Sequence, residues 1–276
     1  MIPAYRQFGT DDQVSALSFL GSALLLLGYP EQSAASTEAA LARARTMGRA
    51  FATTLALSHA AFLGTLGGDL QQAAAYADEA MAHGIEHGLI SPENRARFCQ
   101  GASLAQSGDP KHGIDLMQDA MQASESNGAR LRWTLYLGHV ASAHASLGEP
   151  EAALVLLDEA IQTAEFIGER FFEAELHRLR ANMLLTLGRR DEGESELHRA
   201  LTIARQQKAR WWELRTAISL AEHLRIRGEY REAYSVLQPV YNWFVEGFDR
   251  PDLKEARALL DELRQRSVPQ AHTGVS

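Results

Sequence analysis

The sequence predicts an all-α fold: an α-solenoid of six helix pairs, each about forty residues long, followed by a C-terminal capping helix. Glycines recur every forty residues, a second glycine series lies halfway between them, and the intervening segments show helical rather than strand periodicity. Glycine adopts the left-handed conformation that ends a helix at little cost, so each unit should hold two antiparallel helices. The two series are Gly28, Gly68, Gly108, Gly148, Gly188, Gly228 and Gly48, Gly88, Gly128, Gly168.

Small residues occupy further positions of the same period, and we expect them where the two helices of a pair approach closely. Larger side chains there would push the helices apart. One such series is Gly21, Ala61, Gly101, Ala141, Ala181 and Ala221, and another is Ala40, Ala80, Ala120, Ala160 and Ala200. The predicted repeats cover residues 9–48, 49–88, 89–128, 129–168, 169–208 and 209–248, with a capping helix at 250–265.

The spacing of small residues within one unit resembles the tetratricopeptide (TPR) repeat. Ala141, Ala153 and Ala160 lie 12 and then 7 residues apart, as the glycine or alanine of helix A and the two alanines of helix B do in that family. HEAT and armadillo repeats share the forty-residue length, but their helix-A proline is missing. The resemblance implies a right-handed solenoid and one TPR-like domain over residues 1–266.

The first predicted helix lies in residues 14–29, which carry no charge. Such a segment also suits a signal peptide, but it follows Asp11 and Asp12 and is too short to span a bilayer. Its place in the forty-residue register favours helix A of the first repeat, with no membrane role. Leu24 to Leu27 are more apolar than one buried face requires. We therefore expect an upstream domain or a partner to cover this end.

Repeats two and three contain two patterns that could carry chemistry. His83, Glu86 and His87 have the spacing of an H-x-x-E-H zinc site, but they fall in the last turn of a helix, where polar residues face solvent. Cys99, the single cysteine, is expected to pack in a helix face and fits a reducing cytoplasm. Because there is also no Gly-Lys-Ser/Thr phosphate loop, we expect no metal and no cofactor.

Repeat four supplies the clearest helix start. Pro150 lies between Glu149 and Glu151, which favours a first helical turn, and Leu154 and Leu157 begin an apolar stripe. The adjacent tryptophans at 211 and 212 are expected to pack between repeats five and six, with one of them partly exposed as a contact point.

The C-terminal part departs from the repeat. Pro239 is expected to bend helix B of repeat six, and Pro251 to start the capping helix. Residues 267–276 form a polar tail that we expect to be disordered.

Charge and motifs exclude several classes of function. The net charge of −8 and a pI near 5.7 argue against a nucleic-acid partner, since phosphate binding needs a basic face. Neither a G-x-S-x-G nucleophile turn nor a metal cluster appears in the sequence. The sequence therefore predicts a protein that is not an enzyme.

The TPR resemblance also implies a ligand groove on the helix-A faces. Two interpretations stay open for it: these side chains bind a partner, or Glu175 and Arg215 pair between neighbouring repeats and stabilise the stack. The positions that line such grooves are, in this sequence, Arg95, Phe98, Ser142, Glu175, Arg178, Asn182, Arg215, Glu222 and Arg225.

A narrower resemblance covers nearly the whole chain and is most specific in residues 171–180, 212–221 and 239–256. These runs are similar to the C-terminal TPR-like tails of bacterial signalling proteins in which a cyclase or DNA-binding domain precedes an AAA/STAND-type ATPase. The resemblance implies a cytoplasmic, non-catalytic interaction module that binds a protein or peptide. The alternative is a small-molecule sensor that controls the output domain. A closed superhelical turn with a pocket near Arg178, Asn182, Arg215 and Glu222 would favour the sensor.

Overall fold

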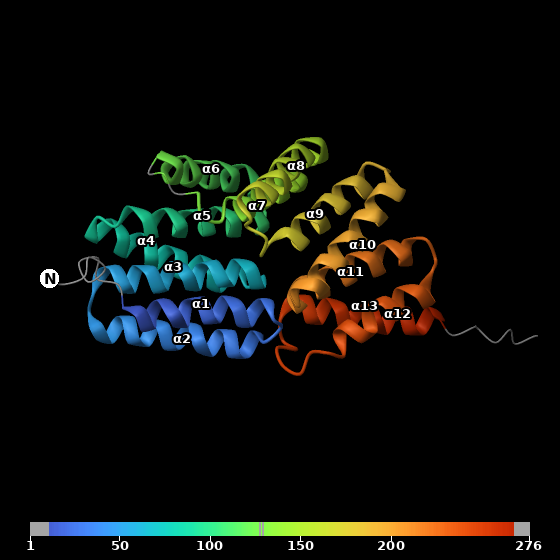
Figure 1. The fold of residues 1–276 in the computed structure, drawn as a ribbon, viewed down its shortest axis with the longest axis horizontal. Coiled ribbons are helices and arrows are strands. Elements are labelled where there is room, and N and C mark those ends of the chain that lie inside the picture. Colours follow the sequence, from blue (N-terminus) through green and yellow to red (C-terminus); the bar gives the residue numbers. More distant parts are fainter. Residues whose placement is uncertain (1–10, 127, 129, 268–276) are drawn as a thin grey trace, which may run out of the picture.

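Thirteen α-helices and no strand occur in the part of the chain that the structure, a computed structural model, describes: residues 11–126, 128 and 130–267 (Figure 1). They are α1 (Asp12–Leu26), α2 (Pro30–Met47), α3 (Ala50–Gly67), α4 (Leu70–His87), α5 (Ile90–Gln106), α6 (Pro110–Ser126), α7 (Trp133–Ser146), α8 (Pro150–Ile167), α9 (Glu173–Thr186), α10 (Arg190–Gln207), α11 (Arg210–Ile226), α12 (Tyr230–Tyr241) and α13 (Pro251–Ser267). The all-α, paired-helix solenoid is as predicted.

The helix ends follow the glycine series. Gly48, Gly68 and Gly168 each end a helix with a positive φ between 62° and 75°. Lys208, which replaces glycine at the fifth position of its series, adopts the same left-handed conformation at φ 56°. The repeat register therefore imposes the cap geometry even where the residue is not glycine.

The small residues lie where paired helices come closest. A Cβ added at Gly101 would lie 2.8 Å from the carbonyl oxygen of Gly113, and one added at Gly64 would lie 2.9 Å from the backbone of Ala73. Real Cβ atoms do not approach backbone so closely, so the predicted close approach of the two helices is confirmed at these pairs.

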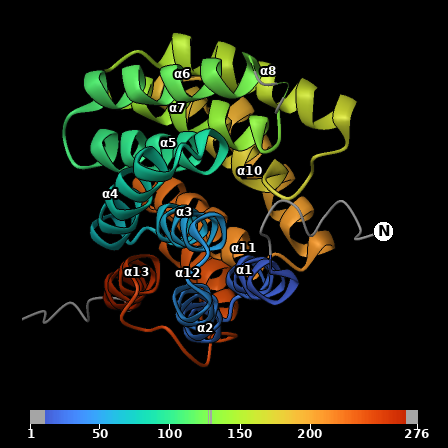
Figure 2. The same ribbon diagram turned by 90° about the vertical axis from the view of Figure 1, so that its left-hand side faces the viewer.

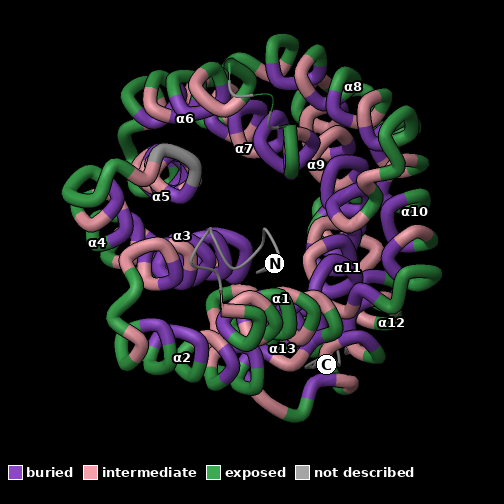
Figure 3. Tube along the Cα trace, turned by 60° about the vertical axis from the view of Figure 1, so that its left-hand side comes forward, coloured by how far each residue is buried: buried purple, intermediate pink, exposed green. Residues whose placement is uncertain are grey.

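The helix pairs curve into a ring, which Figures 2 and 3 show from two neighbouring directions. The first helices of the pairs, such as α5, α7, α9 and α11, lie toward the centre, and α6, α8, α10 and α12 lie outside. Helix α1 contacts α11, so the first and last repeats meet. We call this closed arrangement the helical ring.

Reciprocal hydrogen bonds close the helical ring. A carboxylate oxygen of Glu246 accepts from the backbone N–H groups of Glu31 (2.9 Å) and Gln32 (3.1 Å), at the start of α2. The backbone N–H of Gly247 donates to the Glu31 carboxylate (3.0 Å). Tyr29, the N-cap residue of α2, makes no side-chain cap bond of its own. A residue more than 200 positions away therefore caps this helix.

The C-terminal segment also covers one end of the apolar first repeat. Gly28, at φ +92°, lies so close to it that an added Cβ would meet Trp243 at 2.6 Å. Tyr29 packs against the same tryptophan, with ring centroids 5.5 Å apart. We expected another domain or a partner to cover this end; the structure shows the chain's own last segment there. Phe19 and Leu20 of α1 remain about half exposed.

The core includes α3, which is long and apolar enough to cross a membrane by composition but has 78% of its residues buried among the other helices. Both Trp211 and Trp212 are fully buried, and the Trp212 indole donates to the Phe171 carbonyl at 2.8 Å. The prediction that one of these tryptophans is partly exposed was wrong, because Trp211 is covered by Phe244 and Trp212 packs on Phe172.

The C-terminal elements differ in detail from their predicted bounds. Helix α12 contains Pro239 and ends two residues later, at Tyr241. Ser267, assigned to the tail by the sequence, is the last residue of α13. The rest of the predicted disordered tail, residues 268–276, lies outside the described residues.

Candidate functional site

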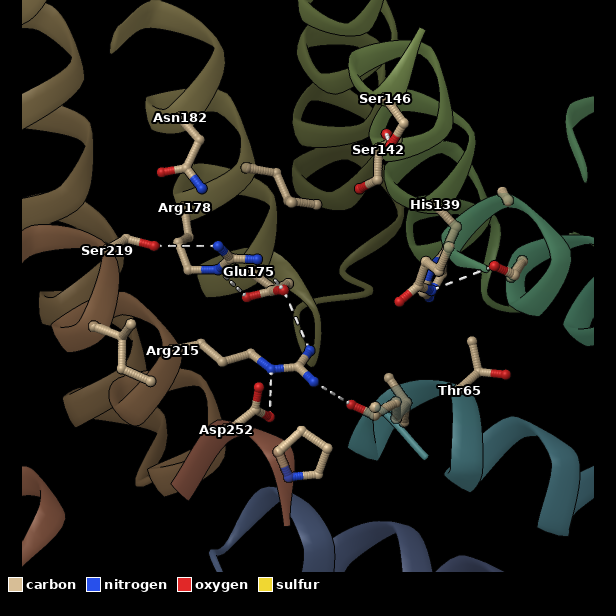
Figure 4. A pocket seen from close by; sticks show the side chains of 18 of the residues that line it. Thr65, His139, Ser142, Ser146, Glu175, Arg178, Asn182, Arg215, Ser219 and Asp252 are labelled. Carbon is tan, nitrogen blue, oxygen red and sulfur yellow. Dashed lines mark hydrogen bonds and ion pairs between the residues drawn. The ribbon is translucent and has the colours of Figure 1, made fainter. Parts of the chain in front are cut away.

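A cavity of about 520 Å³ lies inside the helical ring (Figure 4). Its wall is built by α3, α5, α7, α9 and α11 together with the first turn of α13. The polar side chains that line it are Thr65, Gln106, His139, Ser142, Ser146, Glu175, Arg178, Asn182, Arg215, Ser219, Glu222, Asp252 and Glu255. Its volume is within the range of sites for small ligands, roughly 300–1,000 Å³.

The centre of the wall is a buried charge network around Glu175. Arg178 donates to both oxygens of Glu175 at 2.7 Å, and Arg215 reaches it at 3.4 Å. Burial opposes ionisation of Glu175, but the two guanidinium groups more than offset it, so the pKa of Glu175 lies below its ordinary value. Arg178 also donates to Ser219 at 3.2 Å. The network holds Arg178 across the gap between α9 and α11.

Arg215 links the network to α13 and to α3. It donates to Asp252 of α13 at 2.9 Å and to the backbone carbonyl of Leu66, in the last turn of α3, also at 2.9 Å. Burial opposes its charge, yet Asp252 and Glu175 raise its pKa above the ordinary value. The same side chain therefore lines the cavity and helps to hold the helical ring closed.

His139 of α7 faces the cavity without a partner for its Nε2 among the described residues. Burial, followed by the charge of Arg215, lowers its pKa to about 4. The imidazole is therefore neutral at pH 7, and one of its polar atoms remains to be satisfied by a ligand or by water.

The cavity carries excess negative charge near α13. Its lining has four carboxylates (Glu175, Glu222, Asp252 and Glu255) and two guanidinium groups, a balance of −2 with His139 neutral. Burial, and then the charges of Asp252 and Glu222, raise the pKa of Glu255. Carboxylates that crowd one another in this way favour a cationic group between them.

Six of the nine predicted groove residues line this cavity: Ser142, Glu175, Arg178, Asn182, Arg215 and Glu222. The pairing of Glu175 with Arg215 across repeats is also present, so one pair both stabilises the stack and forms the wall.

The other three predicted groove residues lie elsewhere. Phe98 is buried in a stack on Tyr136, with centroids 3.9 Å apart, so its ring is not free for a ligand. Arg225 pairs with Glu262 of α13 at 3.4 Å. Arg95 contacts His59.

Some lining residues that the sequence analysis missed follow the repeat. His139, Leu179 and Ser219 each lie two positions before a small residue of helix A, and Leu66, Gln106 and Ser146 lie five after one. These two positions within the forty-residue repeat could have identified them. Asp252 and Glu255 had no such signal, because only the packing of α13 against α11 and α12 brings them to the cavity.

The two sequence patterns that could carry chemistry, the pair His83 and His87 and the single Cys99, lie among ordinary packing contacts. His83 Nδ1 lies 2.7 Å from the Thr54 hydroxyl, and the His83 and His87 rings pack 4.5 Å apart. Among the described residues, no group of three His, Cys, Asp or Glu side chains is arranged to hold a metal ion. Cys99 is fully buried, and burial raises the pKa of its thiol to about 11. A thiol with that pKa is a poor nucleophile.

No protein-family model and no curated protein matches the sequence. Solved structures do match. A Rap protein complexed with Competence and Sporulation Factor has a TM-score of 0.65 at 12% identity, over 92% of this chain and 74% of that one. NprR in complex with its cognate peptide NprX has a TM-score of 0.57 at 12% identity, over 95% and 80%.

A third similar structure is a STAND (signal transduction ATPase with numerous domains) protein with a tetratricopeptide repeat sensor from Pyrococcus horikoshii. Its TM-score is 0.50 at 14% identity, over 91% of this chain and 44% of that one. At these identities the similarity shows the fold alone. That fold is a TPR-like helical repeat, which resembles Rap and NprR regulators and STAND sensor domains and is typical of protein- and peptide-binding modules.

Proposed function

We propose that this chain is a non-catalytic recognition module that binds a small cationic ligand, or the amine-bearing end of a short peptide, in its central cavity. The observation that carries the proposal is the position of α13. Packed against α11 and α12, α13 adds Asp252 and Glu255 to a wall that already holds Glu222. An ammonium group placed there would relieve the repulsion among these carboxylates.

The rest of the cavity supplies the specificity that such a ligand needs. Asn182 and Ser142 offer hydrogen-bonding groups, and His139 offers a neutral nitrogen without a partner among the described residues. Arg178 and Arg215 are held by carboxylates, so they shape the wall more than they attract anions. This is the pattern of a binding site, in which a few placed polar groups orient a ligand.

The closed turn favours a sensor over a scaffold that reads an extended partner along an open groove. The Rap structure contains Competence and Sporulation Factor and the NprR structure contains its cognate peptide NprX, which supports a peptide as one ligand class. We propose that ligand binding here is passed to an ATPase or another output domain in a bacterial signalling system, and the similarity to the tetratricopeptide repeat sensor of a STAND protein supports this.

The proposal is tested by thermal-shift titration with a defined panel of small diamines, polyamines and tripeptides with free or acetylated N-termini. We expect at least one amine-bearing class to raise the melting temperature of the wild-type protein, and acetylation to abolish the effect. Asn182→Leu removes polar contacts from the cavity and should lose the response. Gln122→Leu, on the exposed face of α6, is the matched control and should retain it.

Equal responses of Asn182→Leu and the wild type would place binding outside the cavity. Equal responses to free and acetylated peptides would contradict recognition of an amine. A wild-type protein that responds to no member of the panel would also contradict the proposal.

A second candidate function, docking of a partner protein, is favoured by the outer face of α8. Phe166 is 91% exposed there and Val155 is 68% exposed, on one stripe of the helix. Phe166 and Trp133 border a surface hollow of about 310 Å³. Large exposed apolar side chains often mark protein contact sites.

Affinity capture tests this second candidate. The wild type and Phe166→Ser are compared, with Ile226→Ser as the control because Ile226 is also exposed but lies on another helix. A protein captured by the wild type and the control but not by Phe166→Ser would support docking at α8. Capture by all three would exclude that face.

A further inference from the structure

A second polar cluster lies in the first half of the helical ring, around His59 of α3. The guanidinium of Arg95, on α5, approaches His59 Nδ1 at 3.0 Å. The guanidinium of Arg132, directly before α7, approaches His59 Nε2 at 3.1 Å. Arg132 also lies over Phe62, 4.3 Å from the centroid of its ring. We call His59, Arg95 and Arg132 the basic cluster.

The hydrogen bonds of the basic cluster cannot all be satisfied. An arginine side chain has only donors, and a neutral imidazole has one acceptor nitrogen and one N–H. With a guanidinium against each nitrogen of His59, one contact brings a donor to a donor. If His59 were protonated, both contacts would do so and three cations would meet. Burial, then Arg95 and Arg132, hold the pKa of His59 well below its ordinary value, so the neutral form applies.

The charge of the basic cluster is also only weakly compensated. Arg132 is 7% exposed and His59 is 3% exposed. No carboxylate among the described residues forms an ion pair with the guanidinium of Arg95 or Arg132, whereas Arg178 in the cavity pairs with one carboxylate and Arg215 with two. A buried charge without a counter-charge is costly.

The backbone holds Arg132 in this position. Its φ is +67°, in the left-handed region that non-glycine residues rarely adopt. The carboxylate of Glu169 accepts from the backbone N–H of Arg132 at 2.6 Å and from the Thr134 hydroxyl at 2.8 Å. Glu169 therefore stabilises the strained turn through the backbone, and the guanidinium remains directed at His59.

We propose that the basic cluster is a second binding site, which takes the oxyanion of a carboxylate or phosphate group beside His59, at the guanidinium groups of Arg95 and Arg132. An oxyanion accepts from both guanidinium groups and supplies the missing negative charge. Phe19, 57% exposed and edge-on to His59 at 5.3 Å, offers an apolar contact beside it.

The site is separate from the cavity. His59, Arg95 and Arg132 each lie seven residues before a cavity-lining residue of the same chain segment (Leu66, Ala102 and His139), a distance of about 10 Å along a helix. The buried side chains of Phe62, Phe98 and Tyr136 lie in the intervening turns. Loss of one site should therefore leave the other able to bind.

The experiment uses sodium phosphate and sodium acetate as probes, each against sodium chloride at equal ionic strength. We expect one or both to raise the melting temperature of the wild-type protein saturably, and the stronger probe identifies the class of oxyanion. Arg95→Met and Arg132→Met keep an apolar stem but remove the charge, and each should lose at least ten-fold in affinity. Arg130→Met, whose arginine is exposed and paired with Glu125, should respond as the wild type does.

A second measurement keeps the proposal testable if Arg132→Met fails to fold. The His59 Cε1–H NMR signal, assigned by its loss in His59→Gln, should shift with phosphate or acetate in the wild type and not in Arg95→Met. A purely structural cluster would show no such shift. A wild type that responds to neither probe beyond chloride, or an Arg95→Met protein that responds fully, would overturn the proposal.

Discussion

The two polar clusters inside the helical ring differ in how the charges of their arginines are balanced. In the cavity, Arg178 and Arg215 are held by Glu175 and Asp252, so the guanidinium groups are neutralised within the protein. In the basic cluster, Arg95 and Arg132 meet on one histidine with no carboxylate paired to them in the described part of the chain. The first arrangement pairs its charges within the protein, and the second has guanidinium groups without a paired carboxylate.

This comparison has consequences for stability. Removing Glu175 from the cavity network should be costly, because it leaves the part-buried Arg178 without its carboxylate and Arg215 with Asp252 alone. Removing a charge from the basic cluster should cost little or even stabilise the ligand-free protein, since it relieves repulsion. The variants below test the first half of this contrast and the closure that brings the cavity together.

The largest effect is expected from Glu175→Gln. Glu175 is 3% exposed and pairs with two arginines, so its loss should lower the free energy of unfolding by about 3–5 kcal/mol. Glu79→Gln breaks an exposed pair with Arg45 and should cost below about 1 kcal/mol. The free energy of unfolding of both variants is measured by denaturant titration. Equal losses in the two variants would mean that the network around Glu175 does not stabilise the protein.

The next effect is a pH dependence of the free energy of unfolding, due to His139. Its pKa falls from 6.5 in the unfolded chain to about 4 in the folded protein, so the unfolded state binds the proton first as pH drops. Stability from this group is therefore complete above pH 6.5 and is lost toward pH 4, by about 3 kcal/mol. His59, whose pKa is also lowered, acts in the same direction.

The free energy of unfolding is measured between pH 7 and 5. This range lies above the ordinary pKa of Glu175, so protonation of that carboxylate does not contribute to the slope. His139→Asn should show a shallower slope than the wild type. Identical slopes would mean that His139 does not remain neutral in the folded protein.

A smaller effect is expected from Gly28→Ala at the closure of the helical ring. An alanine at this positive φ is strained, and its Cβ would also clash with Trp243. Together these effects should lower the free energy of unfolding by about 2 kcal/mol. Gly148→Ala, at φ +76° with open space around it, should cost about 1 kcal/mol. Small-angle scattering should show a larger radius for Gly28→Ala alone. If the two variants unfold alike, the closure contributes little.

The smallest effect is expected from Glu246→Ala, which removes the cap of α2. Loss of a helix cap typically costs about 1 kcal/mol. Asp261→Ala, on the exposed face of α13, serves as the control and should change the melting temperature little. A destabilisation no greater than that of the control would show that water replaces this cap without loss.

Much of the fold could be predicted from the sequence because the repeat makes each local signal recur. The glycine series marked helix ends that the structure confirms, and the TPR-like helix-A positions found six residues of the cavity wall, among them Asn182 and Glu222. The prediction missed His139 and Ser219 because it used only the groove positions of the family. Phe98 was placed in the groove although its ring packs on Tyr136, since periodicity does not show which neighbour a side chain will meet.

The sequence by itself determined the helices, their pairing and the inner face that carries the polar residues, because these depend on contacts within forty residues. Only the tertiary structure decided that the array closes, that Glu246 caps α2, and that Asp252 joins Arg215. It also decided that Arg95 and Arg132 share His59. Small rotations between successive repeats add up over the whole chain, and no local pattern encodes their sum.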